Sequence, residues 1–89
     1  MALAAQAPVT VRGRVLDAAN GTPIAAARVD LGPLSAQSGP DGRFVLGGAS
    51  AGTAVMVVAA VGYRSRRVRL ELLPGLDDEA TVRLEAMAV

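Results

Sequence analysis

The sequence lacks several residue types on which enzyme and metal chemistry commonly depends. It contains no cysteine and no histidine, and all nine of its basic residues are arginine. The absence of cysteine excludes a disulfide, a thiol nucleophile and thiolate metal binding. The absence of histidine removes the usual general base near neutral pH and the commonest zinc ligand. Because lysine is also absent, an isolated serine or threonine has no usual activating base. We therefore expect no catalytic residues, no cofactor site and no metal site.

Aromatic residues and long hydrophobic runs are also scarce. Phe44 and Tyr63 are the only aromatic residues, so a nucleic-acid site with stacking platforms is not expected. The longest apolar run, 54–62, is far shorter than the roughly 20 residues that a membrane-spanning helix needs. A net charge of +1 gives the chain as a whole no attraction for an anionic partner. With 89 residues, the chain is expected to form one small domain.

Turn sequences recur along the chain between short segments of alternating hydrophobic residues. Turns about 8–12 residues apart, joined by such segments, are typical of an antiparallel β-sandwich. The Asn20-Gly21 dipeptide is a strong turn signal because both residues tolerate positive φ. Pro40 and Gly42 suit a turn with proline at its first corner. The residues that we expect in turns are Asp17, Asn20, Gly21, Pro23, Pro40, Asp41, Gly42, Gly62 and Tyr63.

The alternation also predicts which side chains face the interior. In 67–72, valine and leucine alternate with arginine and glutamate. The segment 54–60 is apolar on both faces, so we expect a central strand covered on both sides, preceded by a loop at 47–52. Gly13 interrupts the first strand, 9–16, and indicates a bulge or a close approach of another segment. The expected core consists of Val11, Val15, Val29, Leu31, Phe44, Leu46, Val55, Val57, Val68, Leu70, Leu72, Val82 and Leu84.

Two further expectations concern the positions of strands in the sheets. The segment 35–38 is short and polar, which favours an edge strand. If the last two strands, 67–72 and 80–86, pair with each other, their outward arginine and glutamate side chains would lie opposite one another.

The order and spacing of these residues resemble a known domain family. The pattern begins with Val11-x-Gly13-x-Val15-x-Asp17-x-x-Asn20-Gly21-x-Pro23-Ile24-x-x-Ala27-x-Val29 and continues with Asp41-Gly42-Arg43-Phe44-Val45-Leu46, Gly52 and Gly62-Tyr63. From about Val9 to Leu84, the chain is similar to the carboxypeptidase regulatory-like domain family. Two departures are Ala26-Ala27, where the family usually has Gly-Ala, and Ser38-Gly39, where it usually has Thr-Asp. The second departure removes a side chain that could cap the following turn.

The resemblance implies a seven-stranded Greek-key β-sandwich of the prealbumin-like type. Such domains are non-catalytic appendages in secreted proteins, beside peptidase domains, in surface and adhesin-like chains, and at the N-termini of TonB-dependent outer-membrane receptors. We therefore expect an accessory domain of a larger exported bacterial protein, located in the periplasm, in the outer membrane or outside the cell. Its expected partner is a neighbouring domain of the same chain or another cell-envelope protein. The sequence does not indicate the oligomeric state.

Two other functions stay open on the sequence alone. One is a carbohydrate- or other ligand-binding module, although sugar sites depend heavily on exposed aromatic rings and the chain has one tyrosine and no tryptophan. The other is self-association through an exposed strand edge or through the apolar segment 54–60.

The pattern also divides the chain. Residues 1–8 are expected to be a flexible alanine-rich lead-in, either the end of a secretion signal or a cloning remnant. Residues 9–86 form the expected domain, and 87–89 form a tail toward a following domain.

Two groups of acidic and amide residues are candidate sites. Asp17 and Asn20 fit an Asx-type turn better than a cation site, because a calcium loop needs several converging carboxylates. The run 77–79 (Asp-Asp-Glu), together with Asp41, would bind a divalent ion if the loops converge; a solvated loop is the favoured interpretation.

A basic cluster and a single tyrosine complete the candidates. Arg64, Arg66, Arg67 and Arg69 would be split between two faces of a strand, so we favour a solvated sheet face over a nucleic-acid site, with an anionic surface or acidic partner as the alternative. For Tyr63, we favour a corner residue with a packed ring and a hydroxyl bonded to the backbone over a ligand-stacking residue.

Overall fold

The computed structural model describes residues 8–75 and 77–87. The expectations for 1–7 and for 88–89 lie outside the described residues. Within them, the chain forms seven strands and no helix. The strands are β1 (Val9–Asp17), β2 (Arg28–Leu31), β3 (Leu34–Gln37), β4 (Arg43–Ala49), β5 (Gly52–Ala59), β6 (Arg66–Leu72) and β7 (Asp78–Leu84).

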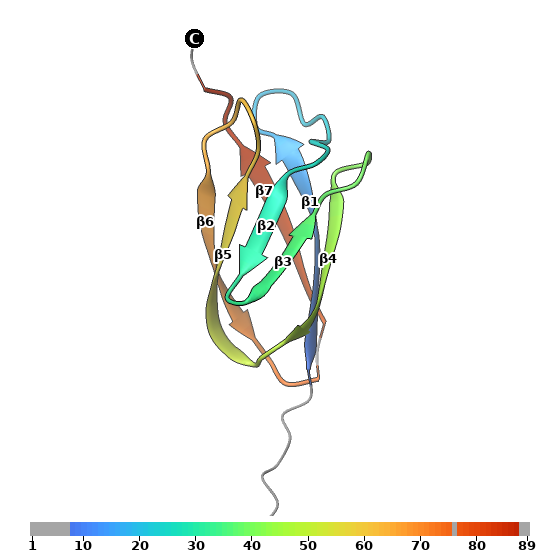
Figure 1. Cartoon of the computed structure of the whole chain (residues 1–89), viewed down its shortest axis with the longest axis vertical. Helices are drawn as coiled ribbons and strands as arrows, with labels where there is room; N and C mark the ends of the chain where they lie inside the picture. Colours follow the sequence, from blue (N-terminus) through green and yellow to red (C-terminus); the bar gives the residue numbers. More distant parts are fainter. Residues whose placement is uncertain (1–7, 76, 88–89) are drawn as a thin grey trace, which may run out of the picture.

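The strands form two sheets that face each other (Figure 1). One sheet has three strands in the order β4-β1-β7, and the other has four in the order β3-β2-β5-β6. The predicted all-β sandwich of seven strands is confirmed. The short strand β3 lies at a sheet edge, as its polar sequence predicts.

The pairing of β1 differs from a purely antiparallel arrangement. β1 is antiparallel to β4 but parallel to β7. The connection after β6 carries the chain from the edge of the four-stranded sheet to the other sheet, where β7 lies beside β1. The suggested pairing of the last two strands is therefore wrong: β6 pairs with β5, and the charged residues of β6 and β7 are not cross-strand partners.

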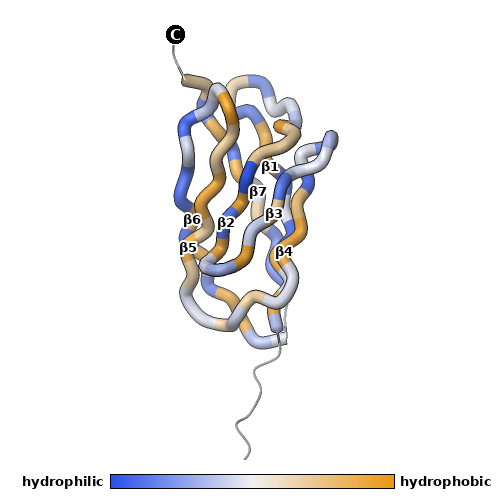
Figure 2. The backbone as a smooth tube through the Cα atoms, in the orientation of Figure 1, coloured by the Kyte–Doolittle hydropathy of each residue, from blue (hydrophilic) through white to orange (hydrophobic). Residues whose placement is uncertain are grey.

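The core between the two sheets is built from small and medium side chains around one aromatic ring. The ring belongs to Phe44, which is 2% exposed. Figure 2 shows β5 as an almost continuously hydrophobic segment beside the hydrophilic first half of β6. The buried hydrophobic residues are Val9, Val11, Val15, Ile24, Ala27, Val29, Leu31, Phe44, Leu46, Ala49, Met56, Val58, Leu70, Leu72, Val82 and Leu84. Val68 is half-buried and packs against this cluster.

The orientation of β5 corrects the expectation for Val55 and Val57. Met56 and Val58 are fully buried, so the intervening residues point away from the core. Val55 is 48% exposed and Val57 is half-buried. Because the whole segment is apolar, its hydrophobicity did not distinguish its two faces. The other sheet covers only one of them.

The loop expected at 47–52 is also shorter than predicted. β4 continues to Ala49, because this residue pairs with Val9 at the start of β1. β5 then begins at Gly52, which leaves only Ser50 and Ala51 between the two strands.

Gly13 lies where another segment approaches closely. It pairs with Phe44 on β4 and with Ala80 on β7. A Cβ atom on Gly13 would overlap the carbonyl oxygen of Ala80 and lie 2.6 Å from Cζ of Phe44. The close approach is thus confirmed, whereas the irregularity in the pairing of β1 lies between Val9 and Val11. The missing side chain of Gly13 makes room for the Phe44 ring.

Replacing Gly13 should therefore disrupt the core. We expect Gly13→Ala to lower the free energy of unfolding by about 1–3 kcal/mol or more, because neither the Ala80 backbone nor the buried ring can move freely. The matched control is Gly47→Ala on β4, where a Cβ would meet nothing within 4 Å. This control should be neutral or stabilising by up to about 1 kcal/mol. Urea denaturation measures both, and equal effects of the two substitutions would contradict the close-packing argument.

Ala26 adopts a backbone conformation that suits glycine. Its φ is 58°, the only positive φ of a non-glycine residue in the described parts of the chain. The turn holds it there, since its N–H donates to the carbonyl of Ser38 at 2.9 Å. The left-handed conformation costs an L-residue roughly 1–2 kcal/mol. This φ explains why glycine suits position 26, where the family that the sequence resembles usually has it.

Glycine at position 26 should relieve this strain. We expect Ala26→Gly to be neutral or to raise the free energy of unfolding by up to about 1 kcal/mol, because the relief offsets the greater entropy of the unfolded chain. Ala25→Gly, at the exposed neighbouring position, should instead lower it by about 0.4–1 kcal/mol. Thermal unfolding of the two variants side by side tests the difference, and equal losses would show that Ala26 is unstrained.

Candidate functional site

The most connected polar group lies at the end of β1. Asp17 is 8% exposed and uses both of its carboxylate oxygens. Its Oδ1 accepts hydrogen bonds from the N–H groups of Ala19 at 2.8 Å and Asn20 at 3.3 Å, an Asx-type turn. Its Oδ2 accepts a hydrogen bond from the Tyr63 hydroxyl at 2.8 Å. The side chain thus fixes the turn after β1 and links it to the corner between β5 and β6.

Asn20 completes the same turn. Its Oδ1 accepts hydrogen bonds from the N–H of Thr22 at 3.0 Å and from the Thr22 hydroxyl. Gly21 between them has a φ of 74°. The oxygens of Asp17 and Asn20 are therefore directed at the chain itself and do not converge on a common point as cation ligands would.

Tyr63 corrects one detail of the sequence interpretation. Its hydroxyl was expected to bond to the backbone, but it donates to the Asp17 carboxylate, 46 residues away in the chain. Its ring is half-buried and packs against the core. Its backbone forms an isolated antiparallel bridge with Ala86, next to the end of β7. Spacing in the sequence gave no signal for a contact between residues this distant.

The hydrogen bond between these two side chains shifts both pKa values. The Tyr63 hydroxyl, with the backbone N–H groups of Ala19 and Asn20, lowers the pKa of Asp17 below its usual value, although burial acts in the opposite direction. The Asp17 carboxylate raises the pKa of Tyr63, and burial adds to this shift. Near neutral pH, the pair therefore consists of an ionised carboxylate and a protonated phenol.

Ser38 is a buried polar residue whose role the sequence did not reveal. It is 6% exposed. Its hydroxyl accepts a hydrogen bond from the N–H of Ala27 at 2.9 Å and donates one to the carbonyl of Ile24 at 2.6 Å. It thereby ties the segment before β2 to the segment before β4. Its polar character had indicated only an exposed edge, and no periodic signal marked it as buried.

The turn that follows is built as its residues predict. Gly42 has a φ of 77°, and a Cβ there would lie 2.6 Å from the carbonyl oxygen of Val15. Asp41 accepts a hydrogen bond from the N–H of Arg43 at 3.1 Å, and its carboxylate lies 3.5 Å from the Arg43 guanidinium. Asp41 therefore caps the turn, although Gly39 replaces the family's usual aspartate.

The acidic residues of 77–79 do not converge with Asp41. Asp78 pairs with Val11 on β1, whereas the turn containing Asp41 lies beside Val15, ~13 Å further along the strand. Among 8–75 and 77–87, no three histidine, cysteine, aspartate or glutamate residues are grouped so that they could hold a metal ion.

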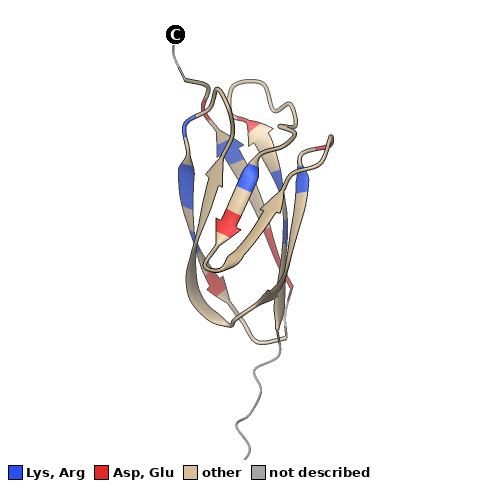
Figure 3. Cartoon of the chain, viewed as in Figure 1, with Lys and Arg blue, Asp and Glu red and all other residues tan. Residues whose placement is uncertain are grey.

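The basic residues of β6 are divided between two directions. Arg67 and Arg69 pair with Val57 and Val55 on the outer face of the four-stranded sheet. Arg66 points toward the other sheet, where its Nη1 donates to the carbonyl oxygen of Arg83 at 3.1 Å. Figure 3 shows further basic residues on β1 and β4, outside this cluster.

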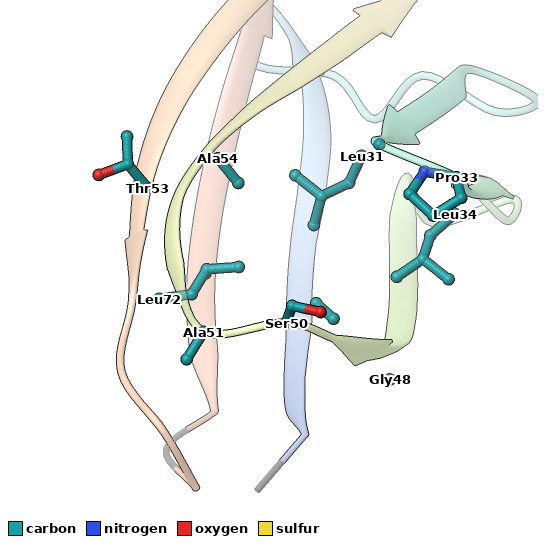
Figure 4. A pocket seen from close by; sticks show the side chains of 11 residues that line it. Leu31, Pro33, Leu34, Gly48, Ser50, Ala51, Thr53, Ala54 and Leu72 are labelled. Carbon is teal, nitrogen blue, oxygen red and sulfur yellow. The ribbon is translucent and has the colours of Figure 1, made fainter. Parts of the chain in front are cut away.

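One apolar hollow opens between the loop that joins β2 to β3 and the loop that joins β4 to β5 (Figure 4). Its volume is about 210 Å³, below the roughly 300–1,000 Å³ of typical ligand pockets. Leu31, Leu34 and Leu72 contribute apolar walls. Of its polar side chains, Thr53 is already bonded to Glu71 at 2.9 Å. The hollow has no aromatic lining residue on which a sugar ring could stack.

Comparison with known sequences identifies the domain. The sequence profile of the carboxypeptidase regulatory-like domain matches residues 10–85. The chain belongs to this family. A search of curated protein sequences gives no match.

Several solved structures are similar to this family member. The 3-chlorocatechol 1,2-dioxygenase of Rhodococcus opacus 1CP has a TM-score of 0.77 at 13% identity, over 93% of this chain and 61% of that one. A chain of the type II cohesin–X-dockerin complex of Acetivibrio cellulolyticus has a TM-score of 0.70 at 22% identity, over 91% and 61%. The minor pilin of Streptococcus agalactiae has a TM-score of 0.69 at 11% identity, over 94% and 46%.

These similarities concern the fold alone. The identities are low, and the domain spans less than two thirds of each of these three chains. Among the described residues, there is no helix of the length and apolar character needed to cross a membrane.

The bond between Asp17 and Tyr63 should make stability depend on pH at both extremes. The pKa of Asp17 is lowered in the folded state. The ionised carboxylate therefore stabilises the fold above the unfolded pKa of about 4, and this stabilisation is lost as the pH falls through the lower folded pKa. The pKa of Tyr63 is raised in the folded state. The protonated hydroxyl therefore stabilises the fold below about pH 10, and this stabilisation is lost as the pH rises through the higher folded pKa. Tyr63→Phe should lower the free energy of unfolding at neutral pH. It should also make the decreases of this free energy at acid and at alkaline pH smaller.

Chemical denaturation across the pH range measures this effect. Asp77→Asn serves as the control, because it removes a titrating carboxylate from an exposed position and leaves the bond between Asp17 and Tyr63 in place. The same acid and alkaline slopes in Tyr63→Phe and in the unmodified domain would show that the bond contributes nothing.

Proposed function

We propose that this domain is a non-catalytic accessory module of a larger exported bacterial protein, in which it separates and docks neighbouring domains. The observation that carries the proposal is the path of the chain through the sandwich. β1 begins at one end of the long axis, and the segment after β7 leaves at the opposite end (Figure 1). A module with this path increases the distance between whatever precedes it and whatever follows it.

The polar residues support a structural rather than a catalytic role. The oxygens of Asp17 and Ser38 are engaged in hydrogen bonds within the fold. Catalysis by a serine needs an adjacent base, and the chain has neither histidine nor lysine. Among the described residues, no buried side-chain nitrogen or oxygen lacks a hydrogen-bond partner. The dioxygenase similarity is one of fold, and a fold can support many functions.

Family membership and structural relatives support a role in contacts between proteins. The relatives include a chain of a cohesin–X-dockerin complex and a minor pilin. Of the parent proteins known for the family, an N-terminal extension of a TonB-dependent receptor is preferred over a peptidase appendage, by family analogy alone. The periplasm, the outer membrane or the extracellular space is the corresponding location.

The gene-length reading frame and the cellular location test this proposal. An antibody against the domain should detect, in the envelope or secreted fraction, a protein clearly larger than the 9.0 kDa of this chain. The reading frame should encode an export signal and at least one further domain. A cytoplasmic protein of 9.0 kDa would overturn the proposal, and a downstream peptidase domain in place of a β-barrel would overturn only the preferred parent.

A further inference from the structure

The outer face of the three-stranded sheet carries a ring of side chains around a bare patch of backbone. The patch is formed by Gly13 and its two cross-strand neighbours, Phe44 and Ala80, whose side chains belong to the inner face. The residues on either side of each of these three point outward. They enclose a hollow of about 450 Å³, and they are Arg12, Arg14, Arg43, Val45, Glu79 and Thr81. We call this set the arginine ring.

The arginine ring is positively charged, although the whole chain is nearly neutral. It contains three arginines and one glutamate, all exposed, and Arg83 extends the same face along β7. Glu79 lies beside Arg12, so the least compensated part of the ring is on the side of Arg14 and Arg43. The net charge of +1 conceals this local excess because the carboxylates lie elsewhere in the fold.

Arg14 and Arg43 are direct cross-strand partners. Like charges placed opposite one another destabilise a sheet. The nearest carboxylate, Asp41, is 3.5 Å from Arg43, but both side chains are more than half exposed, which weakens the pair. On the other sheet, Arg28 lies 3.1 Å from Asp30 on its own strand, in a pair that is also exposed. Among the described residues, Arg14 has no carboxylate within salt-bridge distance, and its cross-strand neighbour Arg43 carries the same charge.

We propose that the arginine ring binds an extended acidic segment of a partner protein. Guanidinium groups pair with carboxylates through two parallel hydrogen bonds. Arg12 and Arg14 are two residues apart on one strand, a spacing of ~7 Å, and alternate side chains of an extended peptide have the same spacing. In a peptide with an acidic residue at every second position, the spacing of the carboxylates therefore matches the spacing of Arg12 and Arg14 on β1. The Thr81 hydroxyl adds a neutral donor at the rim.

The composition of the arginine ring favours a peptide over single-stranded nucleic acid. Non-specific binding of single strands uses exposed aromatic side chains on which bases stack. Phe44 is the only aromatic residue that lines the hollow, and it is only 2% exposed. The inference rests on the proposed function, because it assumes that the domain acts by contacting other proteins. It adds to that function the face that makes the contact.

A labelled synthetic peptide in which glutamate alternates with serine is a suitable probe. Its binding to the domain is measured by fluorescence anisotropy at low ionic strength, where exposed charges are least screened. We expect Arg14→Gln/Arg43→Gln to weaken binding about tenfold or more. The matched control is Arg67→Gln/Arg69→Gln, which removes two exposed arginines from the outer face of the other sheet and gives the same net charge. It should change the affinity by less than about twofold.

Stability provides a second readout, because Arg14→Gln should raise the melting temperature by removing the repulsion from Arg43. The inference is overturned if the unmodified domain does not bind the peptide, if both double variants weaken binding equally, or if Arg14→Gln lowers the melting temperature. Tighter, Arg14-dependent binding to polyphosphate or to vesicles of anionic lipid would overturn the assignment to a peptide. If the protein is located in the envelope but does not bind the peptide, the inference fails and the proposed function stands. If the domain binds the peptide but the protein is cytoplasmic, the proposed function fails and the peptide inference stands.

Discussion

The sandwich depends on covering one face of each sheet with the other, and no disulfide assists it, since the chain has no cysteine. A domain of this size buries a limited share of its surface, so its margin of stability is small. The largest buried ring, that of Phe44, is accommodated because the facing position on β1 is Gly13. β1 pairs with a strand on each side, and a displacement of Phe44 would therefore disturb the whole smaller sheet.

Polar side chains at one end of the sandwich join segments that are distant in the sequence. Asp17 links the end of β1 to Tyr63, and Ser38 links the segment before β4 to Ile24 and Ala27. Buried polar groups are costly unless they are hydrogen-bonded, and these groups are. These bonds hold the end of β1 and the segments before β2 and β4 in place.

The outer faces of the two sheets differ in how their charges are balanced. On the four-stranded sheet, Arg28 and Asp30 form an ion pair, and Thr53 is bonded to Glu71. On the three-stranded sheet, Arg43 lies 3.5 Å from Asp41 of the preceding turn but faces Arg14 across the strands. Charged groups at a surface contribute mainly to the specificity and rate of association with a partner. The proposed docking face is accordingly the one on which two arginines lie opposite each other.

The sequence by itself determined the class of fold, because period-two hydrophobicity and turn residues act locally along the chain. The turns at Asn20-Gly21 and Pro40–Gly42 and the edge position of β3 follow from such local signals. Local signals did not determine which face of the uniformly apolar β5 is buried, since Val55 and Met56 are both apolar and only packing against the second sheet separates them. Tertiary structure alone brought Asp17 to Tyr63, placed β7 beside β1 and set Arg14 opposite Arg43, because each of these contacts joins residues that no local preference relates.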